Sequence, residues 1–152
     1  MIKVKLFKQS KGYCGPASLK MLLSHYGINK SEKVLAKLTG ATRKQGCPPQ
    51  SIVKIAKRLG FRAYYKENCS IKELKRWVGS GIPVIVGWFS PEEDGHYSVA
   101  VGFHKDIILL ADPHFGKLRK IKTVKFVNRW FGFDEPPNKS NLFLRGMIVI
   151  KR

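Results

Sequence analysis

Cys14 stands where the sequence pattern predicts the start of a helix, in the stretch QSKGYCGPASLKMLLSHYG. A thiol is a weak nucleophile until it loses its proton, and the unpaired N–H groups at a helix N-terminus stabilise the thiolate. Pro16 suits the first turn, because its missing N–H would have no partner there. Gly15 lets another backbone or a substrate approach the sulfur. Cys14 is therefore a candidate nucleophile, although a free cysteine beside an amphipathic helix is more often a core residue.

A base for this cysteine is predicted in the stretch EEDGHYSVAVGFHKDIILLADPHFG, which contains two strand-like runs joined by a tight connection at residues 104–105. In a hairpin, a short loop there places His96 beside or opposite Asp112. Neighbouring side chains on one face of a hairpin lie within about 5.5 Å at Cβ, so the carboxylate meets the imidazole and orients it. If this end of the hairpin faces the first helix, Cys14, His96 and Asp112 form a nucleophile, a base and an orienting acid.

Two further features flank these residues. Gln9 lies in the loop before Cys14, where its amide is placed to donate to an oxyanion together with the Cys14 N–H; the alternative is an exposed loop glutamine. The run Glu92–Asp94 precedes His96, and a solvated acidic loop is the default interpretation. A sharper hypothesis is that its charge favours the protonated form of His96, and with it the thiolate.

The other cysteines and histidines have weaker cases. Cys47, in GCPPQ, is interpreted as a turn or helix-entry residue near the site, and Cys69 as structural. His25 is expected to be packed or at the surface, and His104 to lie at the hairpin tip. His114 competes with His96 as the base, but it follows the strand end rather than lying across from it. No Cys-x-x-Cys or His-x-x-x-His pair occurs, so no metal site is predicted.

The elements that must position these residues follow from periodicity. Alternation over residues 2–6 predicts a half-buried strand. Apolar spacing predicts helices over about 14–26, 31–39, the stretch after CPPQ, and 70–80, where Ser70 and Glu73 form a capping box. Strands are predicted over 83–88, 97–103 and 107–111, then a short helix near 124–130 and a last strand in LRGMIVI. The fold class is therefore α+β in one domain, with helices over about 8–80 and an antiparallel sheet over about 81–152 that includes the N-terminal strand.

The composition limits the classes of partner. The chain has 152 residues with 29 Lys and Arg against 10 Asp and Glu, a net charge of +19. This balance predicts attraction to polyanions, acidic peptides or anionic membranes, and a merely solvated basic surface is the plain alternative. Three cysteines, an odd count, argue against a disulfide framework. No signal-peptide pattern opens the chain, and the most apolar stretch, IPVIVGWF, is too short to span a bilayer, so we expect a cytoplasmic protein without an integral membrane segment.

The ordered set Q-x-x-x-Y-C-G-P-A-S, GIPVIVGW, GHYSVAVGF and ADPHFG resembles the bacteriocin-processing, or double-glycine, cysteine peptidases, and most of all their stand-alone relatives. The resemblance runs from Gln9 to Trp130. It implies a papain-like fold, in which a helical half with the nucleophile packs on an antiparallel sheet. By position it implies Gln9 at the oxyanion hole, Cys14 as nucleophile, His96 as base and Asp112 as orienter. Peptidases of this family are usually fused to membrane and ATP-binding transporter domains, which we do not expect here, and the spacing from glutamine to cysteine varies among related sequences.

The resemblance implies a cysteine peptidase that hydrolyses a peptide or protein substrate through a thioester, without a metal or organic cofactor. It also implies cleavage after small residues such as Gly-Gly. Two other functions stay open at this point. One is a catalytically idle papain-like module that binds acidic peptides or nucleic acid through the basic surface. The other is a thiol acyltransferase, because the same thioester serves hydrolysis and transfer.

Overall fold

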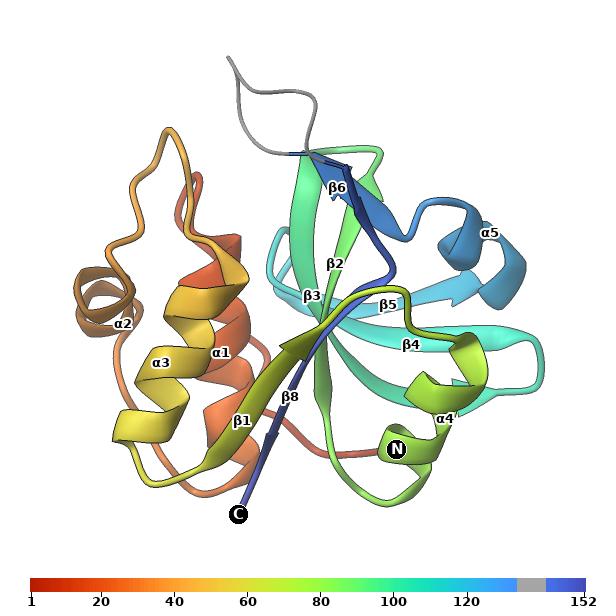
Figure 1. Ribbon diagram of the computed structural model, residues 1–152, viewed down its shortest axis with the longest axis horizontal. Helices are drawn as coiled ribbons and strands as arrows, with labels where there is room; N and C mark the ends of the chain where they lie inside the picture. The colour runs from red at the N-terminus through yellow and green to blue at the C-terminus, as the bar shows by residue number, and fades with distance from the viewer. Residues whose placement is uncertain (134–141) are drawn as a thin grey trace.

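A six-stranded antiparallel sheet forms the centre of the computed structural model, which describes residues 1–133 and 142–152 (Figure 1). Its strand order is β1-β8-β2-β3-β4-β5. The bounds are β1 (Arg62–Lys66), β2 (Val84–Ser90), β3 (Asp94–His104), β4 (Ile107–Asp112), β5 (Lys117–Lys122) and β8 (Gly146–Lys151). A separate two-stranded ribbon pairs β6 (Phe131–Phe133) with β7 (Leu142–Leu144). The last strand of the chain, β8, lies between β1 and β2, so hydrogen bonds join the C-terminal segment to the middle of the chain.

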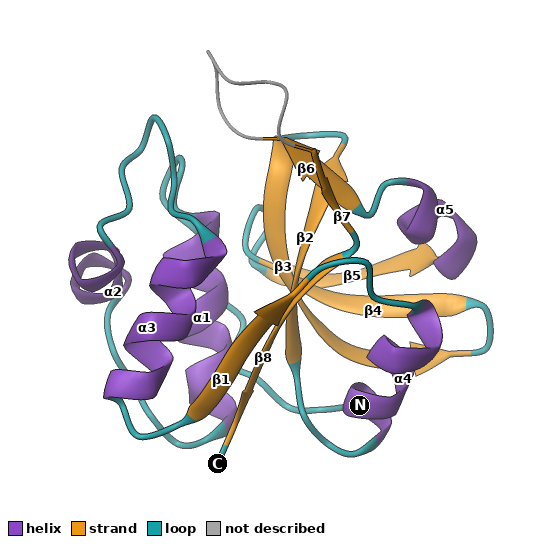
Figure 2. Ribbon diagram, in the orientation of Figure 1, coloured by secondary structure: helices purple, strands orange, loops and turns teal. Residues whose placement is uncertain are grey.

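Helices cover both faces of this sheet, as Figure 2 shows. The helices α1 (Cys14–His25), α2 (Glu32–Thr39) and α3 (Pro49–Arg58) form a layer on one side, while α4 (Ile71–Gly79) and α5 (Thr123–Asn128) lie on the other. The predicted caps are present: Ser31 and Ser70 accept N–H groups from the first turns of α2 and α4. The predicted α+β class is confirmed.

The position of β2 between two cores explains why its sequence, VIVGWFS, is almost wholly apolar. Ile85 packs into the core beneath α1, α2 and α3, whereas Val84 and Val86 pack into the second core with α4 and α5. Successive side chains of a strand point to opposite faces, so a strand covered on both faces needs apolar residues throughout. The edge strand β5, with the sequence KLRKIK, instead consists mostly of charged residues and was not predicted.

The predicted hairpin is confirmed in β3 and β4, with a two-residue loop after His104. A register shift between Ala100 and Gly102 inserts one extra residue into β3. Beyond the shift Val99 pairs with Ala111, so Asp112 lies opposite Ser98, which is two residues from His96. Residues two apart on a strand share a face. The bulge therefore puts His96 and Asp112 on one face, and without the shift they would point to opposite faces.

The predicted strand over residues 2–6 is wrong. Ile2 donates its N–H to Val101 O, but Lys5 donates to the Ser24 side chain on α1, so no ladder of backbone hydrogen bonds forms. The segment crosses from the sheet to the helical layer, and its alternation reflects packing of Ile2 and Val4 against the core. The division at residue 81 also needs correction, because β1 lies within the stretch predicted as helical and pairs with β8.

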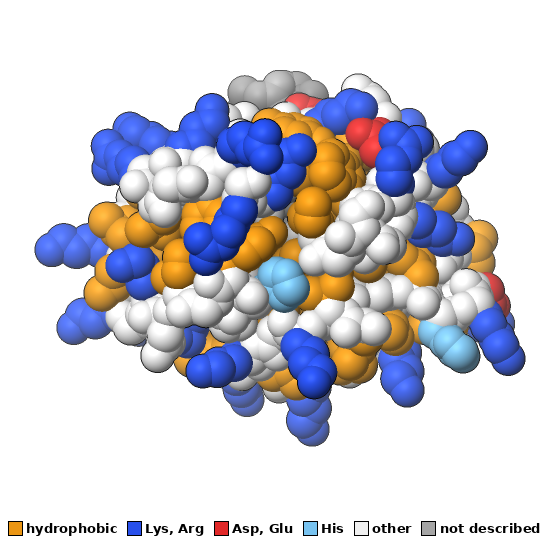
Figure 3. Space-filling view, turned by 90° about the horizontal axis from the view of Figure 1, so that it is seen from below, with side chains coloured by type: hydrophobic (Ala, Val, Ile, Leu, Met, Phe, Trp, Pro, Cys, Tyr) orange, Lys and Arg blue, Asp and Glu red, His pale blue; other side chains and the backbone are white. Residues whose placement is uncertain are grey.

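Among the charged side chains on the face shown in Figure 3, the structure seen from below, Lys and Arg predominate. Lys and Arg are spread across this face, and Asp and Glu are sparse on it. The net charge of +19 is thus distributed widely rather than confined to one helix. Attraction to an acidic or polyanionic partner stays a prediction.

Candidate active site

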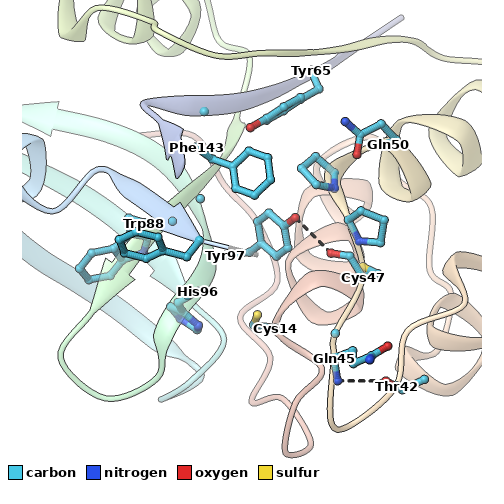
Figure 4. Close-up of a pocket in the computed structure, with 18 of the residues that line it drawn as sticks. Cys14, Thr42, Gln45, Cys47, Gln50, Tyr65, Trp88, His96, Tyr97 and Phe143 are labelled. Carbon is cyan, nitrogen blue, oxygen red and sulfur yellow. Dashed lines mark hydrogen bonds between the residues drawn. The ribbon is translucent and has the colours of Figure 1, made fainter. Parts of the chain in front are cut away.

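Cys14 is the first residue of α1 and lines a cleft of about 580 Å³ between the helical layer and the sheet. The helix begins without a side-chain cap, because Tyr13 at the N-cap makes no such hydrogen bond. The first N–H groups of a helix have no partner within it, so the start of α1 offers donors to an anion at the cleft. Figure 4 shows Cys14 on the helical side of the cleft and His96 on the sheet side.

His96 and Asp112 form a buried pair. His96 Nε2 lies 2.6 Å from Asp112 Oδ1, and both side chains have no exposed surface. Burial by itself lowers the pKa of His96, but the hydrogen bond with Asp112, the interaction with Cys14 and the negative charges of both raise this pKa to about 10. The other ring nitrogen, Nδ1, makes no well-aligned hydrogen bond with the described residues. The structure thus brings Cys14, His96 and Asp112 to one cleft, and their roles as nucleophile, base and orienter stay a prediction.

Asp112 is held by more than the histidine. Arg119 on β5 donates from Nη1 to Asp112 Oδ2 at 3.0 Å, and the His114 backbone N–H donates to Oδ1 at 3.0 Å. Burial raises the pKa of Asp112, but the hydrogen bond and charge of His96, together with these donors, lower it below its ordinary value. Asp112 is therefore ionised beside the histidine. Arg119 was missed in the sequence. It pairs with Leu110, two residues from Asp112, so the register of β4 and β5 places it on the same face of the sheet as Asp112.

Trp88 covers the histidine–aspartate pair and was also missed as a site residue. Its ring meets the His96 ring edge-on with centroids 6.1 Å apart, and its indole N–H donates to Ser98 Oγ at 3.0 Å. The Arg119 guanidinium lies over the Trp88 ring at 5.2 Å. Trp88 on β2 is paired with His96 on β3. Alignment of these two strands would therefore have identified Trp88 as a neighbour of the base. An aromatic cover keeps water from the pair and strengthens its electrostatic interaction.

Gln9 lies beside the predicted site through backbone and side-chain contacts. Its N–H donates to Pro113 O at 2.8 Å, next to Asp112 in the chain. Its side-chain Nε2 donates to Ser10 O and to Glu93 Oε1, both at 3.2 Å. Its Oε1 is buried and has no partner among the described residues. The amide of Gln9 is therefore held near the site by Glu93, and its role at an oxyanion stays a prediction.

The cleft is tightly packed next to the nucleophile. A Cβ added to Gly15 would lie 2.7 Å from Cys47 Sγ and 3.4 Å from the Tyr97 ring. The Tyr97 hydroxyl donates to Cys47 O at 3.2 Å, which links the sheet to the loop before α3 (Figure 4). Burial and the neighbouring Cys14 raise the pKa of Cys47 to about 12, so its thiol stays protonated. Cys47 is thus a wall residue near the site, as predicted, and Cys69 is buried away from the cleft lining.

Among residues 1–133 and 142–152, no group of three or more His, Cys, Asp and Glu side chains is placed to hold a metal ion. Within the same described part of the chain, none of the helices combines the length and apolar character needed to cross a bilayer.

A helix that begins with a cysteine, packed against an antiparallel sheet with a buried histidine, is the arrangement of the papain-like cysteine peptidases. The whole fold resembles the peptidase domain of Streptococcus ComA, an ABC transporter involved in quorum sensing, with a TM-score of 0.76 and 25% identity over 99% of this chain and 98% of that one. It also resembles a double glycine motif protease from an AMS/PCAT transporter, with a TM-score of 0.75 and 23% identity over 98% of this chain and 91% of that one.

The chain belongs to the Peptidase_C39 like family, whose model matches residues 1–135. It is 31% identical over 123 residues to the lactococcin transport/processing ATP-binding protein LcnC-like of Lactococcus lactis, a match that covers 80% of this chain but 17% of that protein. An uncharacterized protein of Methanothermobacter marburgensis is 30% identical over 115 residues, 75% of each chain. The chain thus spans about a sixth of the lactococcin relative and most of the archaeal one.

Proposed function

We propose that Cys14, His96 and Asp112 act as a catalytic triad that hydrolyses a peptide bond. The observation that carries this proposal is the placement of the His96 ring. Nε2 is bonded to buried Asp112 at 2.6 Å, while Nδ1 makes no well-aligned hydrogen bond with the described residues, and His96 and Cys14 line the same cleft. A carboxylate on one side of an imidazole fixes its orientation and leaves the other side for a nucleophile.

The chemistry follows from this arrangement. The Cys14 thiolate attacks the carbonyl carbon, and the S–C bond forms as the carbonyl electrons move to oxygen. When the tetrahedral intermediate collapses, the C–N bond breaks and His96 gives its Nδ1 proton to the leaving amine. Water then attacks the thioester while His96 accepts a proton from it, and the acid product leaves as the Cys14 thiolate returns. Asp112 keeps its charge throughout and stabilises the imidazolium.

An oxyanion in these steps needs donors aimed at its position. We assign the Cys14 N–H at the uncapped start of α1 and the Gln9 side-chain amide to this task. The Gln9 bond to Ser10 O is long, at 3.2 Å, so this N–H can be exchanged for the oxyanion while Glu93 keeps the other. Replacing Gln9 by Ala should therefore lower kcat more than it raises KM.

The packing around Gly15 supports small substrate residues before the scissile bond. Even one added methyl group at position 15 would meet Cys47 and Tyr97, which are joined by a hydrogen bond, so little width is left beside the nucleophile. The double glycine motif protease, whose structure is a complex with a leader peptide, and the lactococcin transport/processing protein both support a peptide substrate. We propose that the substrate is a peptide or protein cleaved after residues such as Gly-Gly.

The test uses the three cysteines as internal references. Iodoacetamide at neutral pH should label Cys14 first, because burial raises the pKa of Cys47 to about 12 and that of Cys69 to about 11. Exposure alone would give the same order, so the His96→Gln variant is the matched control. Loss of the imidazole should slow labelling of Cys14 at least about tenfold if an ion pair activates it. Unchanged labelling in His96→Gln would contradict the triad.

Cleavage itself is measured by mass spectrometry on peptides that differ only in the two residues before the scissile bond. We expect Gly-Gly and Ala-Gly peptides to be cut, and a Val-Val peptide to be left intact. Cys14→Ala should abolish all cleavage. Equal cleavage of the Val-Val peptide would refute the specificity and leave the triad standing.

A further inference from the structure

Glu93 joins three groups of the site in the turn between β2 and β3. Its Oε2 accepts from His114 Nδ1 at 2.8 Å and lies 3.2 Å from His96 Nδ1. Its Oε1 accepts from Gln9 Nε2 at 3.2 Å. The backbone N–H of Glu93 in turn donates to Ser90 Oγ at 3.0 Å, and the side chain is only 19% exposed. The carboxylate is therefore fixed between the base and the candidate oxyanion donor.

The two acidic neighbours of Glu93, Glu92 and Asp94, form no ion pair with His96 in the described structure. Glu92 forms an ion pair with Arg119, which separates it from the histidine, and Asp94 is exposed at the start of β3. Only Glu93 of this run comes within ion-pair distance of His96 among the described residues. The hypothesis that all three acids act on His96 thus narrows to one residue.

The overall charge makes this local contact significant. A net charge of +19 disfavours the protonated imidazole, whereas an anion within a few ångströms favours it far more strongly. The charged and titratable groups around His96 come from every element packed against it: Cys14 on α1, Glu93 before β3, Asp112 on β4, His114 after β4, and Arg119 on β5 behind Asp112. Asp112 and Glu93 flank the two ring nitrogens, one each.

We propose that Glu93 is a positioning residue of the peptidase site, which holds the Gln9 amide toward Cys14 and adds negative charge beside His96 Nδ1. The proposal rests on the triad proposed above. His114 orients Glu93: the hydrogen bond from its Nδ1–H keeps the Glu93 carboxylate turned toward His96 rather than toward solvent. Substrate binding then needs only one N–H of Gln9 to be released, while Glu93 retains the other.

The charge effect is tested by NMR titration of His96 in the Cys14→Ala background, which does not depend on peptidase activity. Glu93→Gln keeps the shape of the side chain and removes its charge, so the His96 titration should move down by about one pH unit. Asp94→Asn is the matched control, because it removes one charge two residues from His96. Asn also tolerates the positive φ of 59° at this position. Equal shifts in the two variants, or a shift below about 0.3 units in Glu93→Gln, would overturn the proposal.

The positioning effect is tested by kinetics on a cleaved peptide. Glu93→Gln should move the alkaline limb of the kcat/KM profile to lower pH by a similar amount. Glu93→Ala also removes the acceptor for the Gln9 amide. We therefore expect its kcat to be about tenfold lower than that of Glu93→Gln, which keeps an acceptor oxygen, with little difference in KM. Equal kcat in the Ala and Gln variants at the pH optimum would remove the positioning role. Failure of cleavage in the unmodified protein would instead count against the triad, and the NMR result would still report on Glu93.

Discussion

Removing the Arg119 guanidinium should destabilise the fold through Asp112. The Asp112 side chain has no exposed surface, and Arg119 donates to it at 3.0 Å with 20% of its own side chain exposed. Breaking a fully buried ion pair costs about 3–5 kcal/mol. Two features reduce this cost here: Asp112 keeps its bonds to His96 and to the His114 N–H, and Arg119 is partly solvated. The expected loss for Arg119→Gln is therefore about 2 kcal/mol in the free energy of unfolding.

Urea denaturation followed by circular dichroism measures this loss, and the melting temperature should fall by roughly 4–8 °C. Glu92→Gln is the matched control, because Glu92 pairs with the same guanidinium at 2.6 Å but is 27% exposed. Partly exposed pairs contribute below about 1 kcal/mol, so this variant should be close to the unmodified protein. If Arg119→Gln costs no more than Glu92→Gln, then Arg119 does not hold the buried carboxylate, and the account of Asp112 given above is wrong.

Two further predictions concern packing and pH. Gly15→Ala should lower the free energy of unfolding by about 1–3 kcal/mol, because its Cβ would lie 2.7 Å from Cys47 Sγ. Adding Cys47→Ala should recover about half of this loss, and no recovery would place the strain elsewhere. The pKa of His96 rises from 6.5 to about 10 on folding, so its contribution to stability is full below pH 6.5 and is lost as the pH rises through 10. Unfolding measured across this range should show a decline that His96→Gln flattens, and an equal decline in both proteins would contradict it.

The sequence was sufficient for the local features of the site. A helix beginning at Cys14 follows from apolar spacing and from Pro16 in its first turn, and α1 begins at Cys14. The hairpin that carries His96 and Asp112 follows from two strand-like runs and a short connection, because the loop limits how far apart the partners are. These interactions reach only a few residues along the chain, which is the range that periodicity and turn chemistry describe.

Periodicity and turn chemistry did not predict the register of that hairpin. The extra residue between Ala100 and Gly102 places His96 and Asp112 on one face. The run SVAVGF has no polar and apolar alternation that a bulge would interrupt, because this part of β3 is buried on both faces and almost wholly apolar. The predicted proximity was therefore correct, and the feature that produces it was visible only in the structure.

The residues around the triad show the same limit. Arg119 and Glu93 are charged residues in runs of charged residues, so neither differs from its neighbours in the sequence. Their roles depend on which side chain of each run points at the buried pair. The N-terminal segment shows the converse, since its alternation is real but its backbone bonds go to α1 and β3 at separate points.

By itself the sequence determined the α+β class, the helix start at the thiol and the hairpin between base and acid, because each depends on neighbours in the chain. Only the tertiary structure decided that Cys14 and His96 share a cleft, that β8 inserts beside β1, and that Arg119 and Glu93 are the charged residues that contact the pair. These contacts join segments far apart in the chain. They depend on how buried surfaces fit together in three dimensions, and no local pattern encodes that fit.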